Sequence, residues 1–156
     1  MSDRQELWDL IDDFHFCMAT THQGGTMRSR PMSPYVDKSA GVIYFLADAG
    51  APMADQIQAD QDINLAFIAP KDKNFISLSG TAGVSQDQAI IKDLWNPTAE
   101  AWFPGGPGTV ALITITPSSA ELWDGESSKI KTMWEMAKAR RKDQKPDVTE
   151  HKKMSL

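Results

Sequence analysis

The sequence has one cysteine, Cys17, among its 156 residues, and a single cysteine cannot form a disulfide within the chain. No uninterrupted apolar run approaches the ~20 residues that a membrane span needs, so we expect no membrane association. The first ten residues are acidic and lack the basic-then-apolar plan of an export signal. These features together predict a cytoplasmic protein.

Basic residues are scarce over most of the chain. Residues 1–125 carry seven Lys and Arg against 16 Asp and Glu, a net charge of −9, whereas residues 126–156 carry +4. An acidic body cannot hold a nucleic-acid backbone by counterion release, and the one tight basic run, 140–142, is too short to form a DNA site. We therefore expect no nucleic-acid partner. The same scarcity makes Arg28 and Arg30 conspicuous.

Familiar catalytic motifs are absent as well. The sequence has no P-loop, no GxGxxG between a strand and a helix, no GxSxG and no HExxH. The three histidines, His15, His22 and His151, belong to a strand start, a hairpin turn and the C-terminal tail, so we predict no metal site. No residue is assigned a catalytic role.

Two other groups of reactive side chains have structural explanations. Cys17 lies in an apolar strand with no basic neighbour to lower its pKa, which indicates a buried structural thiol. The carboxylate pairs at 12–13 and at 60 and 62 fall at helix ends or turns, where solvation of the helix end explains them.

Hydrophobic periodicity predicts many short strands and few helices. Strands are expected at 16–21, 26–36, 42–47, 63–70, 75–85 and 109–117, with a possible continuation at 120–124. Helices are expected at 4–14, after Pro52, at 86–102 with a break at Asn96-Pro97, and at 127–141. This order favours an antiparallel sheet curled into a barrel. We expect one domain over residues 1–142, terminal helices included, and a polar, frayed tail at 143–156.

The segment from Arg28 to Pro34 is the most informative strand. Alternation places Arg28, Arg30 and Met32 on one face, and two guanidiniums on one face repel each other unless they share an anion. Pro31 and Pro34 prevent full pairing on both sides, so this strand should lie at a sheet edge. An ordinary surface strand whose arginines pair with acids explains the composition equally well.

Six stretches carry a resemblance to a known family: MATTHQGGTMRSRPMSP, VIYFLAD, DQDINLAFIAP, FISLSGTAGV, DLWNPTAEAWFPGGP and ITPSSAELWDG. Together they resemble bacterial general stress proteins of the pyridoxamine 5′-phosphate oxidase-like, FMN-binding split-barrel superfamily. The resemblance spans roughly Leu7 to Gly125, and the WNPxxxxWFPGGP segment is its most specific part. It implies a mainly β fold, a six-stranded antiparallel split β-barrel of Greek-key type with a few short flanking helices. It also implies a homodimer that binds FMN in clefts at the subunit interface.

The resemblance also implies which positions meet the flavin. The arginine-bearing strand runs along the cofactor, the next strand runs beside it, and aromatic residues near the PGGP loop close the cleft or pack in the core. The implied cofactor-binding residues are Arg28, Ser29, Arg30, Pro31, Met32, Phe45, Leu46, Ala47, Asp48, Met53, Trp102 and Phe103.

The sequence departs from the family where many relatives hold the phosphate. A threonine and a Ser-x-Lys are replaced by Ala47, Ala51 and Met53. Each lost charge-assisted contact costs about 1.5 to 3 kcal/mol, so we expect FMN binding to be weakened. The leading hypothesis is an FMN-binding protein, a flavin-dependent oxidoreductase or a flavin-binding stress-response protein. The alternative is a flavin-free split-barrel dimer that binds another ligand or a protein without catalysis.

Overall fold

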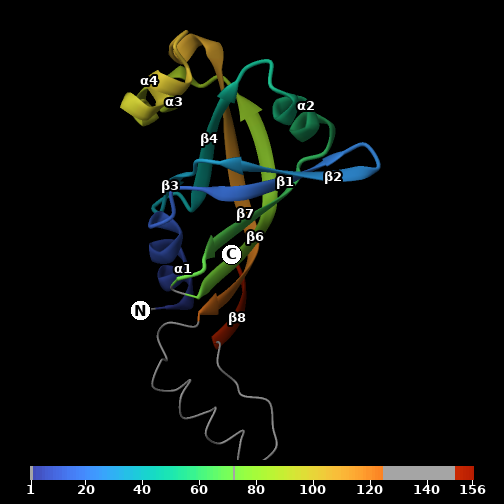
Figure 1. Cartoon of the computed structure of the whole chain (residues 1–156), viewed down its shortest axis with the longest axis vertical. Coiled ribbons are helices and arrows are strands. Elements are labelled where there is room, and N and C mark those ends of the chain that lie inside the picture. Colours follow the sequence, from blue (N-terminus) through green and yellow to red (C-terminus); the bar gives the residue numbers. More distant parts are fainter. Residues whose placement is uncertain (1, 72, 125–149) are drawn as a thin grey trace, which may run out of the picture.

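A single antiparallel sheet dominates the computed structural model, which describes residues 2–71, 73–124 and 150–156 (Figure 1). The strands follow the order β2-β1-β5-β6-β7-β4-β3, and β8 pairs with β7. Their bounds are β1 (Cys17–Gln23), β2 (Thr26–Met32), β3 (Tyr35–Asp37), β4 (Val42–Asp48), β5 (Asp62–Ala69), β6 (Asn74–Ser85), β7 (Val110–Asp124) and β8 (Glu150–Ser155). Among the described residues β2 and β3, the two ends of this path, are not paired with each other. The fold is therefore a split β-barrel, mainly β with short flanking helices, as the sequence predicts.

The structure has eight strands, two more than the six expected, and the additional strands are β3 and β8. The length of β7 explains β8. Its first half, Val110–Ile115, pairs with β4, and its second half, 119–124, pairs with β8. Strand β6 pairs with β7 along nearly its whole length. The other additional strand, β3, is the short piece that follows Pro34, because proline interrupts the ladder that β2 begins.

Helix α1 (Asp3–Asp12) closes one end of the barrel. Ser2 caps its N-terminus and forms a reciprocal capping box with Gln5, so two backbone donors that the helix leaves free are satisfied. Leu7, Trp8 and Ile11 are buried on its inner face. The bounds of this helix are close to the expected 4–14, because the Ser2 cap and the spacing of the apolar residues both indicate a helix over this segment.

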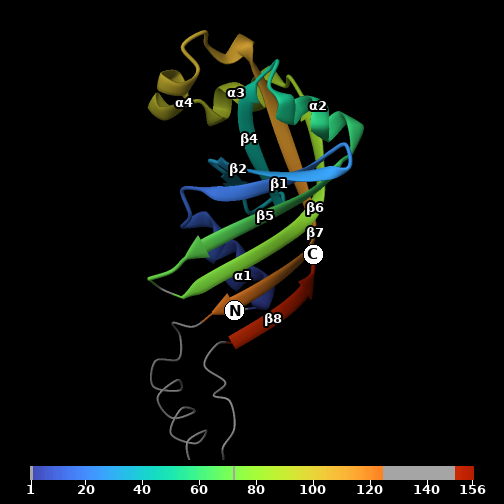
Figure 2. The same cartoon turned by 45° about the vertical axis from the view of Figure 1, so that its right-hand side comes forward.

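Three further helices and one 3-10 turn gather at the opposite end of the long strands. Helix α2 (Pro52–Ala59) lies on one side of β4, and α3 (Gln88–Leu94) with α4 (Pro97–Trp102) lies on the other (Figures 1 and 2). The 3-10 turn η1 (Pro107–Thr109) leads into β7. Proline occupies the first turn of α2 and of α4, where its missing N–H costs nothing. None of the helices in the described ranges is long and apolar enough to cross a bilayer.

The core consists of two groups of buried side chains. The larger fills the barrel and includes Phe45, Leu65 and Phe67, each fully buried. The smaller lies under α3 and α4 and is made of Leu46, Ile91, Ala99, Val110 and Leu112. Successive residues Phe45 and Leu46 of β4 therefore face different cores, and the strand separates the barrel interior from the helical cover.

The C-terminal residues differ from the expected tail. Residues 150–155 form β8 and pair with β7 in register, for example Leu122 with Lys152. Lys152 forms ion pairs with Asp3 and Glu6 of α1, so charge as well as backbone pairing holds this segment against the barrel. The helix expected at 127–141 lies outside the described residues.

Candidate functional site

Strand β2 lies at the edge of the sheet, as Pro31 within it and Pro34 just after it predict. Within the part of the chain that the structure describes it pairs on one side only, with β1, and the register places Arg28 opposite Thr21 and Arg30 opposite Ala19. Because side chains alternate along a strand, both arginines share the face on which Ala19 and Thr21 are buried. This is also the face that contacts α2, which packs on β1.

Arg30 is held in place by two neutral side chains. Its Nη1 donates a hydrogen bond of 2.8 Å to Oγ1 of Thr21, and its Nη2 donates one of 2.6 Å to Oε1 of Gln56 in α2. Thr21 in turn donates from Oγ1 to the same Gln56 oxygen at 2.8 Å. Both partners are buried. The three side chains thus form one network that joins β1, β2 and α2.

The electrostatics of this network favour an anion. Burial and then the neighbouring Arg28 lower the pKa of Arg30, and no carboxylate raises it. The Nε atom of Arg30 is buried without a hydrogen-bond partner. Arg28 is exposed and forms no hydrogen bond or ion pair with any described residue. Two guanidinium charges on one strand face therefore have no counter-charge from any described residue, which is the arrangement that an anionic group such as a phosphate neutralises.

An apolar hollow of about 260 Å³ lies at the C-terminal end of the same strand. Met32 and Leu46 contribute side chains from β2 and β4, and α4 with the residue that follows it closes the other side. The lining residues are Phe16, Pro31, Met32, Ser33, Tyr35, Leu46, Thr98, Ala99, Trp102 and Phe103. Aromatic and aliphatic walls with few polar groups are typical of sites for planar organic ligands.

Five of the twelve predicted cofactor-binding residues line this hollow, namely Pro31, Met32, Leu46, Trp102 and Phe103. Trp102 is 74% exposed, whereas Phe103 is half-buried and packs with its ring centroid 6.2 Å from that of Trp95. Trp95 itself packs against the smaller core. This is the core-packing alternative that the sequence allows for the aromatic residues near the PGGP loop.

The other predicted residues divide between the surface and the core. Arg28, Ser29 and Asp48 are exposed, and Arg30 is half-buried in its network. The side chains of Phe45, Ala47 and Met53 are buried in the larger core, so only their backbone is available to a ligand. The N-terminus of α2, next to Ala51, has no side-chain cap.

Thr21 and Gln56 belong to the site although sequence reasoning missed them. Gln56 shares the buried face of α2 with Met53 and Ile57. An amide on an apolar helix stripe needs a hydrogen-bond partner, which is the feature that could have revealed it. Thr21 likewise continues the buried alternation of Cys17 and Ala19 in β1.

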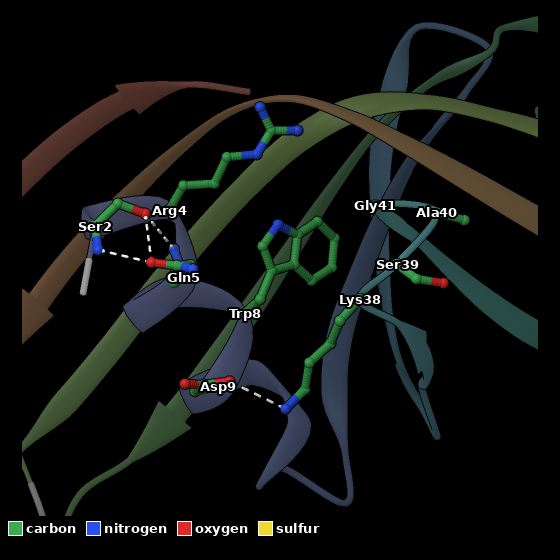
Figure 3. Close-up of a pocket in the computed structure, with 9 residues that line it drawn as sticks. All are labelled: Ser2, Arg4, Gln5, Trp8, Asp9, Lys38, Ser39, Ala40 and Gly41. Atoms are coloured by element: carbon green, nitrogen blue, oxygen red, sulfur yellow. Dashed lines mark hydrogen bonds and ion pairs between the residues drawn. The ribbon is translucent and has the colours of Figure 1, made fainter.

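A second, wider hollow of about 820 Å³ lies between α1 and the turn that joins β3 to β4 (Figure 3). Two cations line it, Arg4 and Lys38, and Lys38 is already paired with Asp9 at 3.0 Å and with Asp12 at 3.1 Å. This ion pairing raises the pKa of Lys38 and neutralises its charge, so Arg4 is the one cation of this hollow that has no acid partner among the described residues. No described acid pairs with Arg28 or Arg30, so two unpaired guanidinium groups share the β2 face, which makes it the better anion site.

Known proteins resemble this chain in sequence and in structure. Protein bli-3 of Neurospora crassa is 30% identical over 91 residues, which cover 56% of this chain and 44% of that protein, so the chain spans less than half of that relative's length. The structure of general stress protein 26 from Jannaschia sp. CCS1 is 30% identical with a TM-score of 0.77, and the match covers 97% of each chain. The general stress FMN/FAD binding protein of Xanthomonas citri is 25% identical with a TM-score of 0.71, over 80% of this chain and 90% of that one.

The family match extends over almost the whole sequence. It includes the arginine-bearing strand, the residues of α2 and the aromatic segment of α4. The family described as pyridoxamine 5′-phosphate oxidase like matches residues 2–147, and the chain belongs to that family.

Proposed function

We propose that this chain binds FMN and serves as a flavin-dependent oxidoreductase or a flavin-binding stress-response protein of the cytoplasm. The observation that carries the proposal is Arg30, a half-buried cation whose hydrogen-bond partners, Thr21 and Gln56, are both neutral. A half-buried cation that has no acid partner among the described residues favours a ligand that supplies a negative charge. The Xanthomonas citri relative, described as an FMN/FAD binding protein, supports a flavin as that ligand.

The two parts of the site suit the two parts of FMN. Arg28 and Arg30 bind the phosphate, because guanidinium groups form bidentate hydrogen bonds with phosphate oxygens. The apolar hollow beside Met32, Leu46 and Phe103 holds the flat ring system. When bound, the flavin supplies the electron-transfer chemistry, and the protein contributes binding and orientation.

A second copy of the chain completes the site in this proposal. Trp102 and Phe16 both line the hollow, yet Trp102 exposes 74% of its surface and Phe16 exposes 65%. Large apolar side chains at the rim of a ligand hollow are favourable places for a partner surface. We therefore propose a homodimer with a two-fold axis, in which each copy covers the hollow of the other.

We also propose that FMN binding is weaker than in relatives with a full phosphate clamp. Ala47 and Met53 are buried in the core, and Ala51 packs against it. None of these three side chains can donate a hydrogen bond to a phosphate. The phosphate contacts that side chains supply are then left to Arg28 and Arg30.

Titration of the purified protein with FMN tests the proposal. Visible flavin absorbance that bleaches on reduction, or quenching of FMN fluorescence at micromolar concentration, is expected for the wild-type chain. Arg30→Ala should weaken FMN binding by about tenfold or more. Thr21 donates to Gln56 at 2.8 Å independently of Arg30, so we expect this contact and the fold to be retained in the variant.

Arg4→Ala is the matched control, because Arg4 is an exposed arginine on α1, away from β2. Its affinity for FMN should equal that of the wild type. A colourless protein that does not quench FMN fluorescence would refute flavin binding and favour the flavin-free binding module. An unchanged affinity in Arg30→Ala would refute the assignment of the phosphate site.

A further inference from the structure

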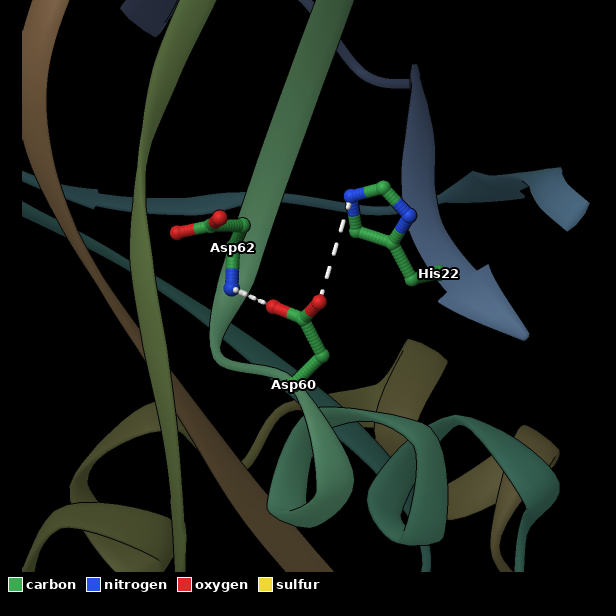
Figure 4. A group of neighbouring side chains, drawn as sticks. All are labelled: His22, Asp60 and Asp62. Carbon is green, nitrogen blue, oxygen red and sulfur yellow. Dashed lines mark hydrogen bonds and ion pairs between the residues drawn. The ribbon is translucent and has the colours of Figure 1, made fainter. Parts of the chain in front are cut away.

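The end of strand β1 and the turn that follows α2 bring together three metal-binding side chains. His22 is the next-to-last residue of β1, Asp60 is the C-cap of α2, and Asp62 begins β5 (Figure 4). One ligand atom of each lies within 4.8 Å of the others. The sequence does not reveal this group, because His22 is far along the chain from the two aspartates and only the pairing of β1 with β5 makes them neighbours.

We propose that His22, Asp60 and Asp62 bind a divalent transition-metal ion, with Zn²⁺ as the best match. This site is separate from the flavin hollow and does not depend on flavin binding. One imidazole nitrogen and two carboxylate oxygens form a donor set that Zn²⁺ accepts, and three protein ligands leave a coordination position for water.

The charge around the group favours a cation. Among the described residues, no Lys or Arg forms an ion pair with Asp60 or Asp62, and the only ion-pair partner of Asp60 is His22, at 4.0 Å. The acidic groups therefore lie side by side without a full counter-charge. A divalent ion neutralises both carboxylates at once.

The distances suit a metal better than a direct hydrogen bond. The Nε2 atom of His22 and the Oδ2 atom of Asp60 are 4.0 Å apart, too far for a hydrogen bond. Two ligands of a tetrahedral zinc ion, each about 2.1 Å from the metal, lie about 3.4 Å from each other. His22 and Asp60 are partly exposed, and side-chain rotations that move their ligand atoms by less than about 1 Å close that difference. Ligand atoms that lie as far apart as 4.8 Å need to approach by about 1.4 Å.

Asp60 is already oriented for this role. Its Oδ1 accepts a hydrogen bond of 3.0 Å from the backbone N–H of Asp62, so the carboxylate is fixed and its Oδ2 faces His22 (Figure 4). A carboxylate oriented by a second hydrogen bond is the usual condition of a metal ligand.

A polar hollow beside the group provides room for metal-bound water. It has a volume of about 320 Å³, and His22, Asp62 and Asn64 line it. Asn64 donates from Nδ2 to Ser77 and to Ser79, each at 3.0 Å, so its amide oxygen remains available to accept a hydrogen bond from such a water. The bound ion ties the end of β1 to the turn after α2, the helix that carries Gln56.

Zinc titration of the full-length, tag-free and metal-stripped protein tests the proposal. Competition with a chromophoric chelator should give one Zn²⁺ per chain, and Zn²⁺ should raise the melting temperature of the wild-type protein. His22→Ala and Asp60→Asn should each weaken binding by tenfold or more and abolish most of the thermal shift. Asp60→Asn keeps the Oδ1 acceptor for the Asp62 N–H, so the turn is preserved.

His151→Ala is the matched control, because His151 also faces a carboxylate, with Nε2 at 3.0 Å from Oε2 of Glu121, and has similar exposure. Its zinc affinity should equal that of the wild type. Zinc binding weaker than about 1 mM in the wild type would overturn the proposal. So would binding that survives both site variants or is lost in His151→Ala. Should Asp60→Asn fail to fold, Asp62→Asn is judged by the same criterion.

Discussion

Arg30 donates a hydrogen bond of 2.6 Å to the amide oxygen of Gln56, and this contact joins the edge strand β2 to helix α2. Gln56 is buried and neutral, so it orients the guanidinium without neutralising it. A carboxylate at the same place would do both. An amide rather than an acid at position 56 therefore keeps the site positively charged.

Gln56→Glu should weaken FMN binding by about tenfold or more. The substitution keeps the shape and the acceptor oxygens, but it gives Arg30 an internal anion that competes with the phosphate. The free energy of unfolding of the flavin-free protein should change by less than about 1 kcal/mol, because a buried pair gains in attraction about what it loses in desolvation. Fluorescence titration and urea unfolding measure the two effects.

Gln58→Glu provides the control for that variant. Gln58 is exposed on the same helix, so the substitution adds the same charge without touching Arg30. Its affinity for FMN should remain within about twofold of the wild type. Equal losses in the two variants would mean that overall charge, and not the Arg30 network, governs binding.

Trp102→Ala should reduce FMN affinity by about tenfold and weaken self-association, with little effect on the stability of the folded chain. The side chain is 74% exposed, so its removal costs the monomer less than about 0.5 kcal/mol. In the proposed dimer the same ring is buried at the hollow, where aromatic residues contribute most of the binding energy. Sedimentation velocity and FMN titration measure these effects.

Met27→Ala separates that effect from a general loss of exposed apolar surface. Met27 is 69% exposed on the β1–β2 hairpin and does not line the apolar hollow. Its variant should resemble the wild type in both measurements. A Trp102→Ala protein that still dimerises and binds FMN normally would contradict the proposed interface.

Sequence patterns predict the strands better than the contacts between them. Pro31 within β2 and Pro34 just after it place this strand correctly at the sheet edge, and alternation places Arg28 and Arg30 on one face. These features are local, so the sequence contains them directly. The neutral partners of Arg30 come from β1 and α2, and their approach depends on the order of the strands, which local patterns do not encode.

The extra strands illustrate the same limit. Strand β8 consists of EHKKMS, a charged segment whose composition is typical of a solvated tail. It becomes a strand because β7 extends past the end of β4 and offers a free edge, and because Lys152 meets Asp3 and Glu6. Both causes lie far from residues 150–155 in the sequence.

Cys17 should resist alkylation in the folded protein and react only on unfolding. Burial raises the pKa of its thiol to about 12 from the ordinary 9.0, so almost no thiolate forms near neutral pH. The folded state then holds a proton that the unfolded state releases between about pH 9 and pH 12. Stability from this group is present below pH 9 and decreases as pH rises through that interval.

Iodoacetamide labelling at pH 8 over a series of urea concentrations tests this prediction. The labelled fraction should follow the unfolding transition measured by tryptophan fluorescence. The stability of Cys17→Ala should depend less on pH above pH 9 than that of the wild type. Rapid labelling of the native protein would show that the thiol is accessible and that its pKa is not raised.

Gly80→Ala should destabilise the fold by about 2 kcal/mol or more. Gly80 lies at a β-bulge between β6 and β7, where a Cβ atom would collide with the Thr116 carbonyl oxygen and come within 2.8 Å of the Pro117 Cα. Both contacts involve backbone, so the strands themselves must shift. Gly83→Ala, in the same strand with no atom within 4 Å of its added Cβ, should be neutral or slightly stabilising. Thermal unfolding of the two variants distinguishes crowding at the bulge from a general effect of replacing glycine, and equal stabilities would show that the bulge tolerates a side chain.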